Sequence, residues 1–123
     1  MSNKKDNADE LITEIIKCIE NIKGEEILLL NLKKIENSPC DYFIICNGSS
    51  NTQVNAIVNK IKKNVSKSLL KKPLHIEGLE NAKWVLIDYF NIVVHVFQRE
   101  IREFYNIEEL WGDAKLTKIT SNY

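Results

Sequence analysis

The sequence contains one pattern typical of nucleotide chemistry. Gly48-Ser49 stands between a predicted strand and a predicted helix, where nucleotidyltransferases place a Gly-Ser pair. Those enzymes also need Asp-x-Asp or Asp-x-Glu about ten residues later, because paired carboxylates hold the metal ions that neutralise a triphosphate. Residues 57–65 (IVNKIKKNV) contain no acidic residue. We therefore interpret the Gly-Ser pair as a turn with a serine cap for the following helix. Phosphate binding at this helix start is the weaker alternative.

Histidine and cysteine are sparse and scattered. His75 and His95 are isolated from each other, and they predict no metal site. The cysteines, Cys18, Cys40 and Cys46, are odd in number and lack Cys-x-x-Cys spacing, which indicates reduced thiols. Cys46 has no recognisable partner residue and is interpreted as a small buried hydrophobic residue. The sequence has no P-loop, Gly-x-Ser-x-Gly or His-Glu-x-x-His motif, so we expect no enzyme, no cofactor and no metal.

Length and composition limit the class of protein. A chain of 123 residues corresponds to one domain. Its 44% hydrophobic and 28% charged residues are ordinary for a globular protein and exclude collagen, a disordered tail and a coiled-coil rod. The apolar run 92–97 is far shorter than the roughly 20 residues of a membrane span. The first ten residues resemble neither a secretory signal nor a basic transit peptide, and we expect a cytoplasmic protein.

Hydrophobic periodicity predicts the secondary structure. Apolar residues at helical spacing predict amphipathic helices over 11–22 and 54–65. Strands are predicted over 26–32, 41–46, 74–76, 84–89 and 92–97, and helical turns near 101–104 and 106–111. The predicted fold class is α/β: a single domain with a mixed sheet of about five strands and helices mainly on one face. We expect a flexible N-terminus over 1–8, the domain over 9–114 and a polar tail over 115–123.

The net charge is zero, but the charges are segregated along the chain. Residues 33–76 carry eight lysines and two acidic residues, whereas residues 77–113 carry eight acidic and three basic residues. Lysines such as Lys62 and Lys63 could contact nucleic-acid phosphates. They spread around the predicted helix and lack an aromatic stacking partner, so a solvated helix face is the alternative interpretation.

The strands over 84–89 and 92–97 predict a β-hairpin with a tight connection at Phe90-Asn91. Because side chains alternate across a strand, one face of this hairpin is entirely apolar and suited to packing on helices. The other face holds Trp84, Leu86, Asp88, Val93, His95 and Phe97. This mixture of aromatic, aliphatic and isolated polar groups is typical of a protein interface. The alternatives are a face covered by further helices and a small-molecule pocket.

An ordered set of motifs extends over nearly the whole chain. In sequence order they are Asp41-Tyr42-Phe43-Ile44-Ile45, Gly48-Ser49-Ser50, Glu77-Gly78-Leu79, Trp84-Val85-Leu86-Ile87-Asp88-Tyr89, Val93-Val94-His95-Val96-Phe97, Arg102-Glu103-Phe104-Tyr105 and Leu110-Trp111-Gly112-Asp113. With these motifs the sequence resembles the ribosomal silencing factor family, also called the Iojap-like family. The resemblance covers residues 9–114. It implies a nucleotidyltransferase-like topology and a homodimer when free of the ribosome.

The resemblance also implies a function. Family members bind the large ribosomal subunit at ribosomal protein fourteen of its intersubunit face, block joining of the small subunit, and so repress translation when nutrients are scarce. The mixed hairpin face is then expected to dock on that protein. Trp84 and Phe97 would be apolar anchors, and Asp88 would accept hydrogen bonds. Leu86 and His95 share the face, Glu77 would complement a basic partner, and Lys62 and Lys63 are candidates for a minor contact with ribosomal RNA.

The hairpin tip departs from the family pattern, which has Gly at the position of Phe90. A bulky residue at positive φ is strained. We therefore expect another turn geometry at the tip, or Asn91 in the left-handed conformation.

Overall fold

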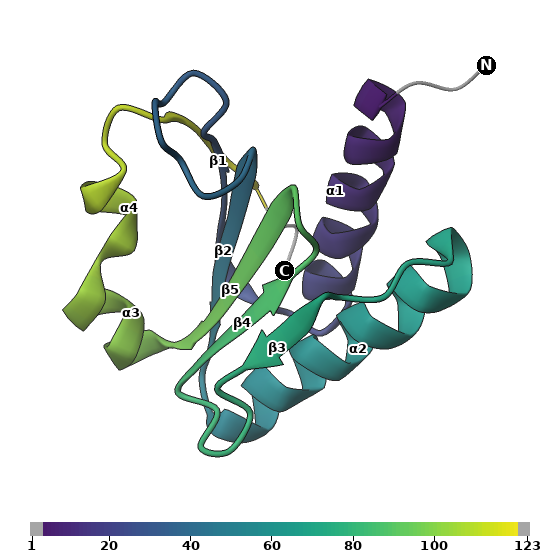
Figure 1. The fold of residues 1–123 in the computed structure, drawn as a ribbon. Coiled ribbons are helices and arrows are strands. Elements are labelled where there is room, and N and C mark those ends of the chain that lie inside the picture. Colours follow the sequence, from purple (N-terminus) through teal and green to yellow (C-terminus); the bar gives the residue numbers. More distant parts are fainter. Residues whose placement is uncertain (1–3, 121–123) are drawn as a thin grey trace.

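A mixed sheet of six strands, in the order β3-β4-β5-β2-β1-β6, forms the centre of the molecule (Figure 1). The computed structural model describes the backbone of residues 4–120 and the side chains of residues 8–120. The strands are β1 (Glu25–Asn31), β2 (Tyr42–Gly48), β3 (His75–Glu77), β4 (Trp84–Asp88), β5 (Ile92–Gln98) and β6 (Lys115–Lys118). β2 and β5 are parallel, and the other neighbouring strands are antiparallel. The predicted α/β class with a mixed sheet is confirmed.

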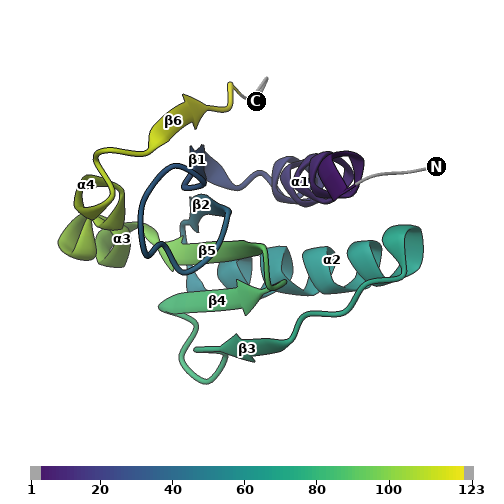
Figure 2. The same ribbon diagram turned by 45° about the horizontal axis from the view of Figure 1, so that its top comes forward.

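The helices lie on both faces of this sheet (Figures 1 and 2). The long helices α1 (Lys4–Asn21) and α2 (Asn51–Leu69) cover one face, and the short helices α3 (Arg99–Tyr105) and α4 (Ile107–Leu110) lie on the other. The Ser50 hydroxyl accepts a hydrogen bond of 3.1 Å from the Gln53 N–H at the start of α2, so the predicted serine cap is confirmed. Within residues 4–120, no helix is long and apolar enough to cross a membrane.

Two hydrophobic cores sandwich the central strands. Alternate residues of β2 and β5, such as Ile44 and Val94, pack under α1 and α2. The residues between them, such as Ile45 and Phe97, pack on the opposite side with Leu30 and Ile107. Both faces of the central strands are therefore buried, which explains why their sequences are almost continuously apolar.

Regular secondary structure extends into both ends of the described chain. α1 begins at Lys4, although residues 1–8 were expected to be flexible; residues 1–3 lie outside the described part of the chain. The sheet has six strands rather than about five, because residues 115–118 of the expected polar tail form β6 beside β1. All four residues of β6 are exposed, so this strand has no buried face and no hydrophobic alternation that could predict it. Residues 121–123 also lie outside the described residues.

The turn at the hairpin tip has the conformation that its sequence disfavours. Phe90 itself takes φ = 79°, so the expectation of another geometry or of a left-handed Asn91 is wrong. The Asn91 N–H donates to the Tyr89 carbonyl over 3.1 Å, which closes a γ-turn around Phe90. Asp88 Oδ1 accepts from the Phe90 N–H over 2.7 Å and holds the strained residue in place. The Phe90 side chain is 76% exposed, so packing contributes little to this arrangement.

Two substitutions of Phe90 separate the effect of backbone strain from the effect of losing the phenyl ring. Phe90→Ala keeps a β-carbon at positive φ, whereas Phe90→Gly removes it. We expect the glycine variant to have the higher free energy of unfolding, by about 1 kcal/mol, because left-handed backbone is strained for residues with a β-carbon. Urea denaturation of the two variants measures the difference. Equal stability of the two would contradict the strained tip.

Candidate functional site

The mixed face of the β4–β5 hairpin has the predicted register. Trp84 pairs with Phe97, Leu86 with His95, and Asp88 with Val93. These six residues therefore share one face, on the side of the sheet that α1 and α2 leave uncovered. The prediction that Trp84, Leu86, Asp88, His95 and Phe97 lie on the same face of the hairpin is confirmed.

Burial divides this face into two halves. Trp84, Leu86 and Asp88 are half-buried, but His95 is only 4% exposed and Phe97 is fully buried. The Phe97 ring stacks under Trp84 at 4.8 Å and belongs to the core that Ile107 and Trp111 help to close. The expectation that Phe97 is an exposed anchor is therefore wrong. α3 and α4 cover one half of the face, to which the covered-sheet interpretation applies. The interface interpretation stays a prediction for the other half.

The uncovered half forms a groove of about 570 Å³. Its floor contains Phe43, Leu86, Val93 and His95, and its rim contains Asp41, His75, Glu77, Asp88 and Phe90. An apolar floor with three carboxylates around it is suited to a partner that brings apolar and basic side chains together. Glu77 lies on edge strand β3 with an exposed side chain, in reach of such a partner.

His95 orients the aromatic residue at the boundary between the two halves. Trp84 Nε1–H donates to His95 Nδ1 over 3.1 Å, so a neutral His95 carries its proton on Nε2. Within the described residues, Nε2 is buried without a hydrogen-bond partner, and the imidazole contacts the Phe43 ring edge to face at 4.5 Å. Burial lowers the pKa of His95 to about 4. His95 is therefore a neutral acceptor that fixes Trp84 and does not present a charge to a partner.

Asp88 combines two contacts at the rim of the groove. Asp88 Oδ1 accepts a hydrogen bond from the Phe90 N–H, and Asp88 Oδ2 lies 3.7 Å from His75 Nδ1. His75 Nε2 lies 3.0 Å from Glu77 Oε2 on the neighbouring part of β3. Within the described residues, no group of three or more His, Cys, Asp or Glu side chains gathers as a metal site. The arrangement is a surface of carboxylates and one histidine around an apolar floor.

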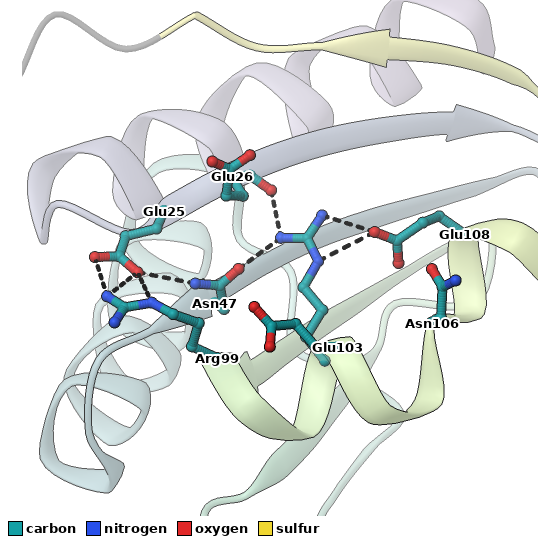
Figure 3. Close-up of a pocket in the computed structure, with 8 residues that line it drawn as sticks. Glu25, Glu26, Asn47, Arg99, Glu103, Asn106 and Glu108 are labelled. Carbon is teal, nitrogen blue, oxygen red and sulfur yellow. Dashed lines mark hydrogen bonds and ion pairs between the residues drawn. The ribbon is translucent and has the colours of Figure 1, made fainter.

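A second cavity, of about 720 Å³, opens where the parallel strands β2 and β5 end (Figure 3). The guanidinium of Arg102 lies in its wall with 8% of the side chain exposed. It donates to the Asn47 side-chain oxygen over 2.7 Å, to the Glu26 carbonyl, and to Glu108 Oε2 over 3.2 and 3.3 Å. Asn47 in turn donates to Glu25, which forms a two-pronged ion pair with Arg99 at 2.7 and 2.8 Å.

Arg102 belongs to one of the sequence motifs, but the sequence did not predict that it would form this hydrogen-bond network. The sequence analysis ended the predicted strand at Cys46, whereas the structure extends β2 through Asn47 and buries this polar side chain. Both arginines of the cavity are paired with carboxylates, whereas no ion pair to Glu103, which also lines the cavity, occurs among the described residues (Figure 3). The polar network around this cavity connects neighbouring elements of the fold, and the acidic side chains that line the cavity outnumber its two arginines.

The remaining candidates for chemistry are occupied or inert. The Ser49 N–H and hydroxyl both donate to Gln53 Oε1, at 2.7 and 2.9 Å. The donors that a phosphate would need are therefore already used in hydrogen bonds that stabilise the turn. Burial raises the pKa of the Cys46 thiol to about 12 and that of Cys40 to about 11, which disfavours the nucleophilic thiolate. Lys62 and Lys63 are exposed on α2, on the opposite side of the sheet from the groove.

The low pKa of His95 predicts a pH-dependent stability. Protonation is disfavoured in the folded state, so the unfolded chain, with the ordinary pKa of 6.5, gains a proton first as the pH falls. We expect the free energy of unfolding to fall by about 3 kcal/mol between pH 6.5 and 4 through this residue. His95→Gln lacks the titrating group, and urea denaturation across this range should give it a flatter profile than the native protein. Parallel profiles would refute the assignment.

Comparisons with known proteins agree with this geometry. A model of the family described as "Ribosomal silencing factor during starvation" matches residues 5–122. A ribosomal silencing factor of Halalkalibacterium halodurans is 40% identical over 110 residues, covering 89% of this chain and 92% of the relative. The chloroplast protein Iojap of Zea mays is 31% identical over 100 residues, which is 81% of this chain and 42% of that protein.

Solved structures show the same fold. A crystal structure from Chromobacterium violaceum superimposes with a TM-score of 0.79 at 34% identity, covering 92% of each chain. One from Bacillus halodurans has a TM-score of 0.77 at 37% identity, covering 90% of this chain and 99% of the other. A family match over almost the whole sequence, together with this fold, places the chain in the ribosomal silencing factor family.

Proposed function

We propose that this protein binds the large ribosomal subunit at ribosomal protein fourteen of the intersubunit face and thereby prevents the small subunit from joining. Translation is repressed in this way when nutrients are limiting, in the cytoplasm, and without catalysis. Membership of the ribosomal silencing factor family supports ribosome-associated repression. The docking residues are inferred from the half-open hairpin face, and the steric mechanism is what the resemblance to the family implies.

The groove beside Trp84 is the observation that carries the proposal. A half-buried tryptophan next to an apolar floor is a good anchor, because interface energy concentrates in such residues. The carboxylates of Asp88 and Glu77 on the rim favour a basic protein partner and disfavour RNA phosphates. We assign Trp84, Leu86, Asp88 and Glu77 to direct contact. His95 and Phe97 lie beneath them and support the surface.

The mechanism requires occupancy and no chemical step. The small subunit approaches the same surface of the large subunit, so a bound protein excludes it sterically. A specific interface buries roughly 1,200–2,000 Å² in total, which a domain of 123 residues can supply. The degree of repression then follows the fraction of large subunits that carry the protein.

A homodimer is proposed for the protein when it is free of the ribosome. Exposed apolar side chains such as Leu70 and Leu79 provide surface for self-contact. If the dimer covers the groove, it has to dissociate before ribosome binding, and the apparent affinity then depends on protein concentration.

Subunit joining tests the proposed function directly. Purified small and large subunits are mixed at a magnesium concentration that favours joining, with and without the protein, and separated on a sucrose gradient. We expect the protein to migrate with the large subunit and the joined ribosome to decrease. Trp84→Ala and Asp88→Arg should each weaken binding by about tenfold or more, because they remove an anchor and reverse a charge at the docking surface.

Matched variants control for folding and for the two roles of Asp88. Asp88→Asn retains a side-chain oxygen for the Phe90 N–H and removes only the charge. Leu116→Ala truncates an exposed side chain on β6, away from the groove. Both should fold normally by circular dichroism, and only Asp88→Asn should weaken binding. Unchanged joined ribosomes with the protein left at the top of the gradient would reject the function, and normal cosedimentation of both Trp84 and Asp88 variants would reject this face.

The exposed lysines of α2 are proposed to make a minor contact with ribosomal RNA. Phosphate contacts make binding depend on salt concentration, and each lost contact lowers the slope of log affinity against log salt by roughly one. Lys62→Glu/Lys63→Glu should therefore flatten this slope while leaving the Trp84-dependent binding in place. Affinities measured between 50 and 200 mM salt, roughly the range in which such effects are large, provide the test. A slope equal to that of the native protein would exclude these two lysines from RNA contact.

A further inference from the structure

The short helices α3 and α4 carry large apolar side chains that point away from the core. Phe104 is 79% exposed, Leu110 is 76% exposed and Tyr105 is 49% exposed. Exposed aromatic and aliphatic groups gathered on 11 residues of helix are unusual for a surface with no partner. The hairpin motif did not predict them, and the groove described above does not include them.

These rings are continuous with the anchor of the proposed docking surface. The Trp84 and Tyr105 rings lie 5.0 Å apart, and Tyr105 meets Phe104 edge to face at 5.0 Å. Together with the Phe97–Trp84 stack, the rings form one series from the core to the outer surface of α3. A partner that contacts Trp84 therefore also approaches Phe104.

The charge of this region favours a basic occupant. Glu100, Glu103, Glu109 and Asp113 are all exposed around these helices. The arginines of α3 do not balance them, because Arg99 is paired with Glu25 and Arg102 is buried against Glu108. Arg99 is thus neutralised at the surface and Arg102 in the interior, and the exposed carboxylates of α3 and α4 are left without these two partners.

We propose that Phe104, Tyr105 and Leu110 form a second part of the docking surface, and that its occupant is a basic protein segment in which an apolar side chain is flanked by lysine or arginine. The inference rests on the proposed binding to the large subunit and adds a site on α3–α4 to the groove. Apolar rings anchor the segment, and the surrounding carboxylates pair with its basic residues. RNA is disfavoured because its phosphates would face the same carboxylates.

A symmetric contact with a second copy of the chain fits this patch poorly. A two-fold interface places the same patch of both copies together. It would bring Glu100, Glu103 and Glu109 of one copy next to those of the other, and like charges in close contact disfavour association. The acidic border is therefore the feature that selects a foreign basic partner.

Paired variants with matched controls test the patch. Phe104→Ser should weaken binding of the native full-length chain to purified large subunits by about tenfold, whereas Leu74→Ser, at an exposed leucine before β3, should change it less than about twofold. Glu100→Lys should weaken binding several-fold, and Glu10→Lys on the distant helix α1 should not. Fluorescence anisotropy of labelled protein measures the affinities, and thermal melting by circular dichroism shows that each variant is folded.

Trp84→Ala, measured in parallel, separates this inference from the proposed function. Failure of the native protein to bind large subunits overturns both. Normal binding by Phe104→Ser alongside weakened binding by Trp84→Ala overturns the second docking site alone. A photo-reactive benzoylphenylalanine at position 104 should cross-link to a large-subunit protein, and cross-linking to ribosomal RNA contradicts the inference. Light scattering that shows loss of a dimer in Phe104→Ser, with unchanged subunit affinity, assigns the patch to self-association and also contradicts it.

Discussion

The buried guanidinium of Arg102 is the interaction on which the second face of the sheet depends. A buried charge is costly unless its hydrogen bonds are satisfied, and Arg102 has acceptors on Asn47, Glu26 and Glu108. These acceptors belong to β2, β1 and α4, so one side chain of α3 joins four elements. Helices of seven and four residues cannot be stable alone. Their position is fixed by this network and by the burial of Ile107.

The position of α3 in turn determines how the hairpin face is divided. α3 places Tyr105 against Trp84, and the adjacent core seals Phe97. The helices are too short to reach the hairpin tip, which leaves the groove open. The same sheet face thus supplies a core for stability and a surface for binding. Trp84 lies at the boundary, in contact with His95, Phe97 and Tyr105. An anchor held by three neighbours loses little conformational freedom on binding, which favours affinity.

Sequence reasoning succeeded where local pattern and structure coincide. The Ser50 cap, the hairpin register and the shared face follow from side-chain alternation and from the residue types at a helix start. It failed where contacts between residues far apart in the sequence determine the structure. The burial of Phe97 depends on α4, and Arg102 depends on Asn47, 55 residues earlier. β6 has no buried face and pairs only through its backbone with β1. Phe90 adopts a conformation that intrinsic preference opposes, because Asp88 and the strand register overrule that preference.

The distribution of charge on the open half of the sheet face suits recognition of a basic partner. Here burial keeps His95 neutral and raises the pKa of the Cys40 and Cys46 thiols, and the arginines beside the second cavity are paired with carboxylates. What remains exposed on this side is apolar surface bordered by His75, by Asp88 and Glu77, and by the carboxylates of α3 and α4. The affinity of such a surface comes from apolar contact, and its acidic border favours a basic partner.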